Sequence, residues 1–180
     1  MTALQLLYAD LSRQYGLEGR GATQPNFFRF LARALHYRFL PNIFCRLSRA
    51  AYVHHVPLIP HVCTYLNLLL FGLEVTPRCE IGPGVFFAHS VGVVIGAARV
   101  GSNATFYQGV TLGARELTIT YDPSTRPTIG NDVLLGAGCR VLGAVQIGDG
   151  AIVGANAVVL HSVPANATVA GVPARVISMQ

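Results

Sequence analysis

The chain has 180 residues, 52% of them hydrophobic and 12% charged, with a net charge of +5. This composition is too apolar for a disordered chain, and the length suits one domain or one domain with an appendage. All 13 basic residues are arginines, which excludes the lysine chemistry of Schiff bases and P-loops. The four cysteines form no CxxC pair, and the Met1 end lacks a signal-peptide pattern, so we expect reduced thiols in the cytoplasm.

Residues 1–74 are expected to form an α-helical N-terminal region. In "PNFFRFLARALHYRF" (25–39) apolar residues recur at helical spacing, and Pro41 is expected to end this helix. Two further apolar or amphipathic segments follow, at 42–55 and 56–72.

This helical region carries no Asp or Glu between Gly19 and Leu73, whereas six arginines lie there. We expect its apolar faces to pack on the rest of the protein or on a sister subunit. Peripheral association with the inner, anionic face of a membrane is the alternative. A spanning helix is not expected, because segment 56–72 is interrupted by two prolines and falls short of the ~20 apolar residues required.

From Val75 onward the hydrophobic period becomes six. The anchors of this repeat are aliphatic or aromatic residues: Val75, Ile81, Phe87, Val93, Val100, Phe106, Leu112, Ile129, Leu135, Val141, Ile147, Val153 and Val159. Four residues after each anchor stands a second small or branched residue, such as Cys79, Val91 or Cys139, and glycine often follows the anchor. A hexapeptide repeat with both positions inward predicts a parallel β-helix, with Cys79 and Cys139 in its core.

The repeat has one extra residue between Val93 and Val100 and one long interruption, "ARELTITYDPSTRPT" (114–128), which is expected to leave the prism as an extruded loop. The expected domains are therefore the helical region 1–74, the β-helix 75–164 with this loop, and a C-terminal tail 165–180. The fold class is mainly β.

Several segments resemble the left-handed β-helix acyltransferases, and within them the serine acetyltransferase branch. They are "CEIGPGVFFAHSVGVVIG", "YQGVTLG", "IGNDVLLGAGCRVLGAVQIGDGAIVGANAVVL" and "AGVPARV". The resemblance implies a triangular left-handed prism of about four coils, acetyl-CoA as the acyl donor with no metal, and a homotrimer with active sites between subunits.

His89 lies in the apolar run "GVFFAHSVGVVIG", where a histidine by itself is typical of a hydrogen-bonded core residue. The resemblance places it at the family's general base, which would take the acceptor's proton and return one to the leaving thiolate. It also matches Glu74 to the carboxylate that orients this base. His161, also two residues past an anchor, is expected at the surface.

On the CoA side, the resemblance implies small residues along the groove, at Gly113, Ala114, Ala137 and Ala155. A backbone N–H near Gly113 and Ala114 would stabilise the oxyanion. Arg175, in "AGVPAR", would meet a CoA phosphate or remain a solvated tail residue.

At the acceptor side the resemblance implies Ala88, Gln108 and Arg126, and here the chain departs from the family. Ala88 replaces an acidic residue that binds the amino acid, and "TRP" (125–127) replaces "RHP". A lost charged contact costs ~1.5–3 kcal/mol. The family's scaffold is also that of O-acetyltransferases of polysaccharide biosynthesis, so the resemblance with this departure favours an O-acetyltransferase for a sugar or glycolipid hydroxyl.

Other functions stay open or are excluded by the residues. Serine O-acetylation for cysteine biosynthesis is the first alternative, and a non-catalytic hexapeptide scaffold is the second. A zinc carbonic anhydrase on the same prism needs three histidine ligands, and the repeat region has only two histidines. No nucleic-acid partner is expected, because the arginines are scattered and no reader motif is present.

Overall fold

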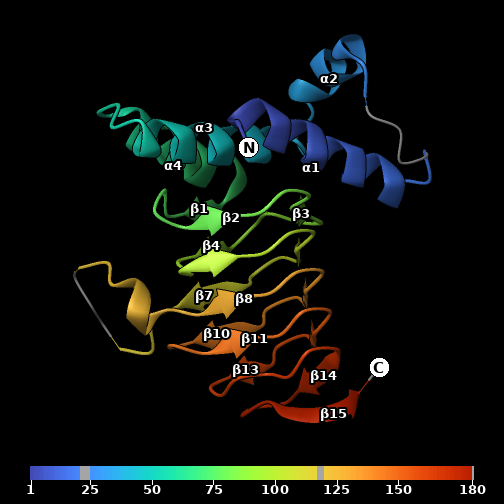
Figure 1. Cartoon of the computed structure of the whole chain (residues 1–180), viewed down its shortest axis with the longest axis vertical. Helices are drawn as coiled ribbons and strands as arrows, with labels where there is room; N and C mark the ends of the chain where they lie inside the picture. The colour runs from blue at the N-terminus through green and yellow to red at the C-terminus, as the bar shows by residue number, and fades with distance from the viewer. Residues whose placement is uncertain (21–24, 117–119, 180) are drawn as a thin grey trace.

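The computed structural model describes residues 1–20, 25–116 and 120–179. Four helices lie across one end of a parallel β-solenoid of about five turns (Figure 1). The expected order of a helical region followed by a β-helix is confirmed. The helices are α1 (Ala3–Leu17), α2 (Phe27–Ala34), α3 (Leu40–Val53) and α4 (Ile59–Phe71).

The solenoid has three faces, each a sheet whose strands come from successive turns. Face A contains β1 (Leu73–Val75), β4 (Val93–Ile95), β7 (Thr111–Gly113), β10 (Arg140–Leu142) and β13 (Val158–Val159). Face B contains β2 (Glu80–Ile81), β5 (Arg99–Val100), β8 (Thr128–Ile129) and β11 (Gln146–Ile147). Face C contains β3 (Phe86–Phe87), β6 (Thr105–Phe106), β9 (Leu134–Leu135), β12 (Ile152–Val153), β14 (Ala167–Ala170) and β15 (Arg175–Met179).

The strand pairing of the solenoid extends beyond residues 75–164 at both ends. Parallel pairing begins at Leu73, which pairs with Val93, and continues past residue 164 into β14, which pairs with β12. The tail then turns back as β15, antiparallel to β14. This extra strand pairing makes about five turns rather than about four.

The hexapeptide anchors form the core. Twelve of the thirteen stack as expected, as in the column Phe87, Phe106, Leu135 and Val153. The exception is on face A, where Ile95, not Val93, pairs with Leu112. Val93 takes the small inward position, and Val91, expected inward, is 69% exposed.

The turn between faces C and A explains this shift. Four residues, 88–91, separate Phe87 from the left-handed Gly92 (φ 73°), whereas only two separate Phe106 from Gly109 (φ 69°) in the next turn. The first turn is therefore two residues longer than a hexapeptide allows. Counting the sequence in steps of six residues does not detect this insertion, which contains His89.

The helix boundaries in the N-terminal region differ from those expected from the sequence. Residues 35–39 lie outside any helix, and Pro41 lies in the first turn of α3 rather than ending α2. Proline is tolerated in a first turn because its missing N–H would have no partner there. Helix α1 is an additional element, with Thr2 and Gln5 forming a capping box at its start.

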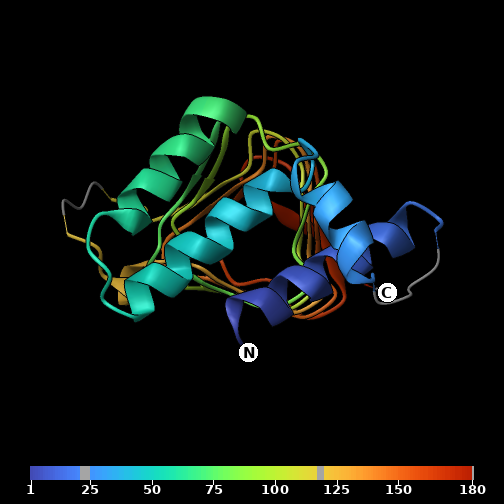
Figure 2. The same ribbon diagram turned by 90° about the horizontal axis from the view of Figure 1, so that it is seen from above.

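The helices close the open end of the prism. Figure 2 shows α3 crossing the triangle while α4 and α1 lie along its sides. At the centre, Arg46 of α3 donates to both carboxylate oxygens of Asp10 of α1 at 2.9 Å. The same guanidinium donates to the carbonyls of Ile81 and Gly82, and Asp10 accepts from the N–H of Val85. The pair thus satisfies backbone groups that the first turn leaves without a strand above them.

Many apolar side chains of α2 and α4 are exposed, including Phe28 at 78% and Leu69 at 66%. No helix in the described part of the chain is both long and apolar enough to cross a membrane.

The four cysteines are buried and have no disulfide partner. Cys79 and Cys139 belong to the solenoid core, as expected, together with Cys45. Burial raises the pKa of each of these three thiols to about 12, so the reactive thiolate is scarce at neutral pH. We expect Ellman's reagent at pH 8 to label them slowly in the folded protein and completely after unfolding. Rapid labelling of all three before unfolding would contradict this packing.

Candidate active site

His89 lies at the corner where face C turns into face A, which we call the histidine corner (residues 88–92, 107–109, 136–138 and 154–156). Its side chain is exposed, and the two-residue insertion carries it out of the prism core. Among the described residues no hydrogen bond holds its imidazole. The histidine is therefore a surface group free to meet a ligand, and not a satisfied core residue.

A cleft of about 410 Å³ opens beside His89. The solenoid contributes residues 87–91, and the helices close the cleft from the other side. The lining residues from the helical region are Tyr37, Arg38, Pro41, Leu70, Phe71 and Gly72. Sequence reasoning did not identify this helical wall, because no motif links the segment between α2 and α3 to the histidine corner.

Two hydrogen bonds to backbone carbonyls hold the solenoid side of the cleft in place. The Ser90 hydroxyl donates to the carbonyl of Phe71 at 3.1 Å, and the N–H of Gly92 donates to the carbonyl of Gly72 at 2.9 Å. These bonds attach the histidine corner to the end of α4. His89 is thus held at the junction between the helices and the solenoid.

Glu74, expected to orient His89, is exposed on β1, where it pairs in register with Val94. It lines a separate cavity with residues of α4. No hydrogen bond joins its carboxylate to His89 in the described chain.

Apart from Arg175, the other expected site residues fall into two groups on opposite edges of face A. Gln108, Ala137 and Ala155 stack at the histidine corner, where Gly138 donates to the Gln108 carbonyl and Asn156 to the Ala137 carbonyl, both at 2.8 Å. Ala88 lies at the same corner, half-buried in the cleft wall. This column continues from His89 toward the C-terminal end of the prism.

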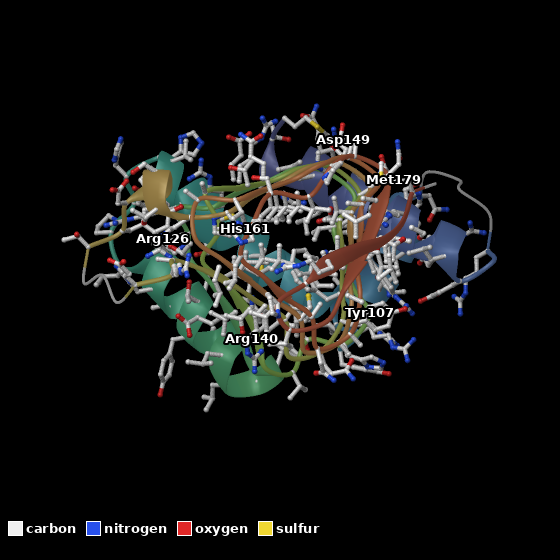
Figure 3. All side chains as sticks on the ribbon, turned by 90° about the horizontal axis from the view of Figure 1, so that it is seen from below. Tyr107, Arg126, Arg140, Asp149, His161 and Met179 are labelled. Carbon is white, nitrogen blue, oxygen red and sulfur yellow. The ribbon has the colours of Figure 1, made fainter. Side chains whose placement is uncertain are left out.

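Gly113, Ala114 and Arg126 lie at the other edge, which we call the loop corner, because the chain leaves the prism there. Figure 3 shows Arg126 on the side of this loop, away from Tyr107 and Arg140. A strand rises about 3.3 Å per residue, so the five residues from Gln108 to Gly113 separate the two edges by roughly 16 Å. One prism therefore does not bring Gly113 to His89.

The C-terminal part of the loop is attached to the prism. Residues 117–119 lie outside the described chain. Arg126 lies 4.4 Å from the Tyr121 ring centroid and donates to the carbonyl of Gly96 at 2.9 Å. The Tyr121 hydroxyl donates to the carbonyl of Ala97, and burial raises the pKa of this tyrosine. Arg126 thus helps to attach the loop to its own prism.

Arg175 and His161 are both exposed in the last turns. Arg175 begins β15 and donates only to the carbonyl of the preceding residue, Ala174, at 3.0 Å. Its guanidinium is open to solvent, as a phosphate contact would require.

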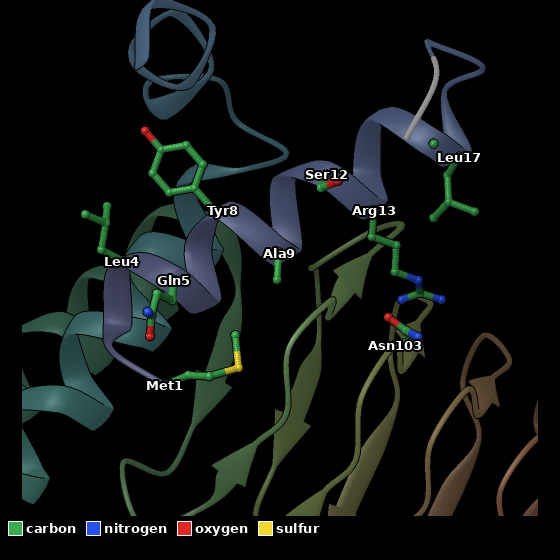
Figure 4. Close-up of a pocket in the computed structure, with 10 residues that line it drawn as sticks. Met1, Leu4, Gln5, Tyr8, Ala9, Ser12, Arg13, Leu17 and Asn103 are labelled. Atoms are coloured by element: carbon green, nitrogen blue, oxygen red, sulfur yellow. The ribbon is translucent and has the colours of Figure 1, made fainter. Parts of the chain in front are cut away.

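A larger cavity of about 960 Å³ runs along α1, with Arg13 and Asn103 on its solenoid side (Figure 4). None of its described lining residues is a histidine or a carboxylate. Those residues therefore offer no general base.

The chain is similar to known acetyltransferases in both sequence and structure. A family model described as bacterial transferase hexapeptide (six repeats) matches residues 126–161. The serine acetyltransferase of Synechococcus elongatus is 44% identical over 133 residues, which cover 73% of this chain and 53% of that protein. The serine acetyltransferase of Helicobacter pylori is 40% identical over 134 residues, which cover 74% of this chain and 77% of that protein.

A solved structure shows the same architecture. The Brucella abortus serine acetyltransferase in complex with coenzyme A superposes with a TM-score of 0.79 at 30% identity, covering 98% of this chain and 68% of that one. The likeness thus includes the helices as well as the solenoid.

These relatives overturn the expected sugar or glycolipid acceptor and the role in polysaccharide biosynthesis. That expectation rested on one missing charge, at Ala88, and on the "TRP" end of the loop. The sequence did not show the helical wall of the cleft, which supplies another charged group, Arg38. With 40% identity over three quarters of the Helicobacter enzyme, this chain belongs to the serine acetyltransferase family of hexapeptide-repeat acetyltransferases.

Proposed function

We propose that this chain is an acetyltransferase that moves the acetyl group of acetyl-CoA to the hydroxyl of serine. The observation that carries the proposal is the exposed, unpaired His89 in a cleft of a chain that matches serine acetyltransferases. The chain spans 53% of the first of these relatives, so the activity is proposed here and not transferred as a property of the whole protein.

The proposed chemistry needs one base and no covalent enzyme intermediate. The neutral imidazole of His89 would accept the proton of the serine hydroxyl as its oxygen attacks the acyl carbon. The resulting imidazolium would then donate this proton to the departing thiolate. Acetyl-CoA would supply the activated thioester. Glu74, turned toward the histidine corner, would hold the imidazole in the productive tautomer.

The histidine corner fits an extended pantetheine chain. Ala137 and Ala155 present only methyl groups, and Gln108 offers an amide in the same column. At the loop corner, the space where a Cβ of Gly113 would stand contains no other atom within 4 Å. We propose these residues, with Ala114 and Arg175, as the CoA-contacting set.

The roughly 16 Å between the two corners favours a homotrimer. If prisms pack side by side, the loop corner of one faces the histidine corner of the next. The Gly113 and Ala114 backbone of one subunit would then reach the reaction at the partner's histidine. The proposed compartment is the cytoplasm, because four free cysteines suit a reducing environment.

The test is the rate of thiol release from acetyl-CoA by the purified chain with different acceptors. We expect release that depends on serine and saturates with it, and background release with sugars and lipid-linked saccharides. Because the protein's own thiols are buried, Ellman's reagent is a suitable probe. Release that depends on a saccharide and not on serine would refute the proposal.

A further inference from the structure

The cleft at His89 has an unbalanced charge. Of its described lining residues, Arg38 carries a full positive charge, His89 becomes positive on protonation, and none is a carboxylate. A cleft of this kind attracts an anionic group and gives no partner to a cationic one. Serine carries an anionic carboxylate and a cationic ammonium group, so the positive charge of the cleft affects which of the two groups is bound.

Arg38 is oriented but not neutralised. Its Nε donates to the Tyr37 hydroxyl at 3.0 Å, and its guanidinium lies 5.6 Å from the centroid of that ring. It forms no ion pair with any described carboxylate, and its two terminal nitrogens donate no described hydrogen bond. A guanidinium edge with two free N–H groups matches a carboxylate bidentately.

Three other arginines of the helical region differ in this respect. Arg13 donates to the carbonyls of Gly84 and Ala104, and Arg46 is buried with Asp10. Arg33 pairs with Glu18. These arginines connect the helices to one another or to the solenoid, whereas Arg38 faces the cleft.

Arg126 does not fill this role within the same prism. It lies at the loop corner, stacked on Tyr121 and bonded to the Gly96 carbonyl, on the far edge of face A from His89. Arg38 and His89 line one cleft of about 410 Å³, within the roughly 300–1,000 Å³ range of small-molecule sites.

We infer that Arg38 binds the carboxylate of the acceptor amino acid while His89 receives the proton of its hydroxyl. This inference rests on the proposed serine acetylation and names the residue that selects the acceptor. Because no acid lines the cleft, and Ala88 stands directly before His89, recognition comes from the acceptor's carboxylate rather than from its ammonium group.

The inference predicts an order among acceptors. Serinamide, which keeps the hydroxyl and the ammonium but lacks the carboxylate, is expected to have a KM about 10- to 100-fold above that of serine, from the loss of a charged hydrogen-bond pair. 3-Hydroxypropionate, which keeps the carboxylate and lacks the ammonium, is expected to remain within about tenfold of serine.

The test is steady-state kinetics of Arg38→Met with serine and serinamide. We expect KM for serine to rise about 10- to 100-fold with kcat changed less than about twofold, since the contact is made equally in ground and transition states. Arg38→Lys should recover part of the loss, and the preference for serine over serinamide should vanish in Arg38→Met. The matched control is Arg99→Met, which changes an exposed arginine of β5 on face B and should behave as wild type.

The outcomes separate this inference from the proposed function. If wild type acetylates serine, but Arg38→Met has the same KM for serine or the same preference for serine over serinamide, the role of Arg38 is overturned. The serine activity itself would remain supported. If wild type does not acetylate serine at all, both fall. A loss of kcat with circular dichroism changed from wild type would mark a structural role for Arg38 and would also overturn the inference.

Discussion

Replacement of His89 by alanine is expected to lower kcat for serine acetylation by about 10²- to 10⁴-fold, the usual contribution of a general base. The residue lies on an exposed corner outside the hydrophobic core, so the substitution leaves no cavity. The melting temperature should therefore stay close to that of wild type. The measurement is the rate of CoA release at saturating serine and acetyl-CoA.

His161→Ala is the matched control for this experiment, because it removes another exposed histidine two residues past an anchor, in a distant turn. It should keep full activity. If His161→Ala lost as much activity as His89→Ala, or if His89→Ala retained more than about a tenth of wild-type kcat, His89 would not be the base.

Replacement of Arg46 by methionine is expected to destabilise the protein by about 3–5 kcal/mol, the usual cost of removing one partner of a buried ion pair. The side chains of Arg46 and Asp10 are 4% and 0% exposed. Without the guanidinium, the Asp10 carboxylate and the carbonyls of Ile81 and Gly82 lose buried partners. The free energy of unfolding, measured in urea by circular dichroism, checks this.

Two further variants give the comparison. Arg20→Ala removes a surface pair with Glu18 and should cost only about 0–1 kcal/mol. Asp10→Asn combined with Arg46→Met should cost less than the sum of the single changes, because the double variant leaves no unpaired charge. A loss below about 1 kcal/mol for Arg46→Met would show that the helices are not attached through this pair.

The solenoid could be predicted from sequence because each turn repeats the same packing requirement. Residues such as Leu112 and Ala151 are fully buried, and no polar side chain would be tolerated there. The prediction was wrong where the chain departs from the period, at Val91 and Val93. A two-residue insertion changes the register without changing the composition, so counting in sixes does not detect it.

The helical region could be predicted as helical but not in its arrangement. The salt bridge of Asp10 and Arg46 joins residues 36 positions apart, and neither belongs to a motif. The same limit applies to the cleft. His89 was found because a family motif surrounds it, whereas Arg38 reaches the cleft only through the packing of α3 and α4 on the first turn.

The central claim is that this chain acetylates the serine hydroxyl with His89 as the base. The most direct test is product identification by NMR, after incubation of the purified chain with serine and acetyl-CoA labelled with ¹³C in the acetyl group. The account predicts that wild type yields O-acetylserine, and that His89→Ala yields only a trace over the same period. Absence of O-acetylserine with wild type, or equal yield from His89→Ala, would contradict it.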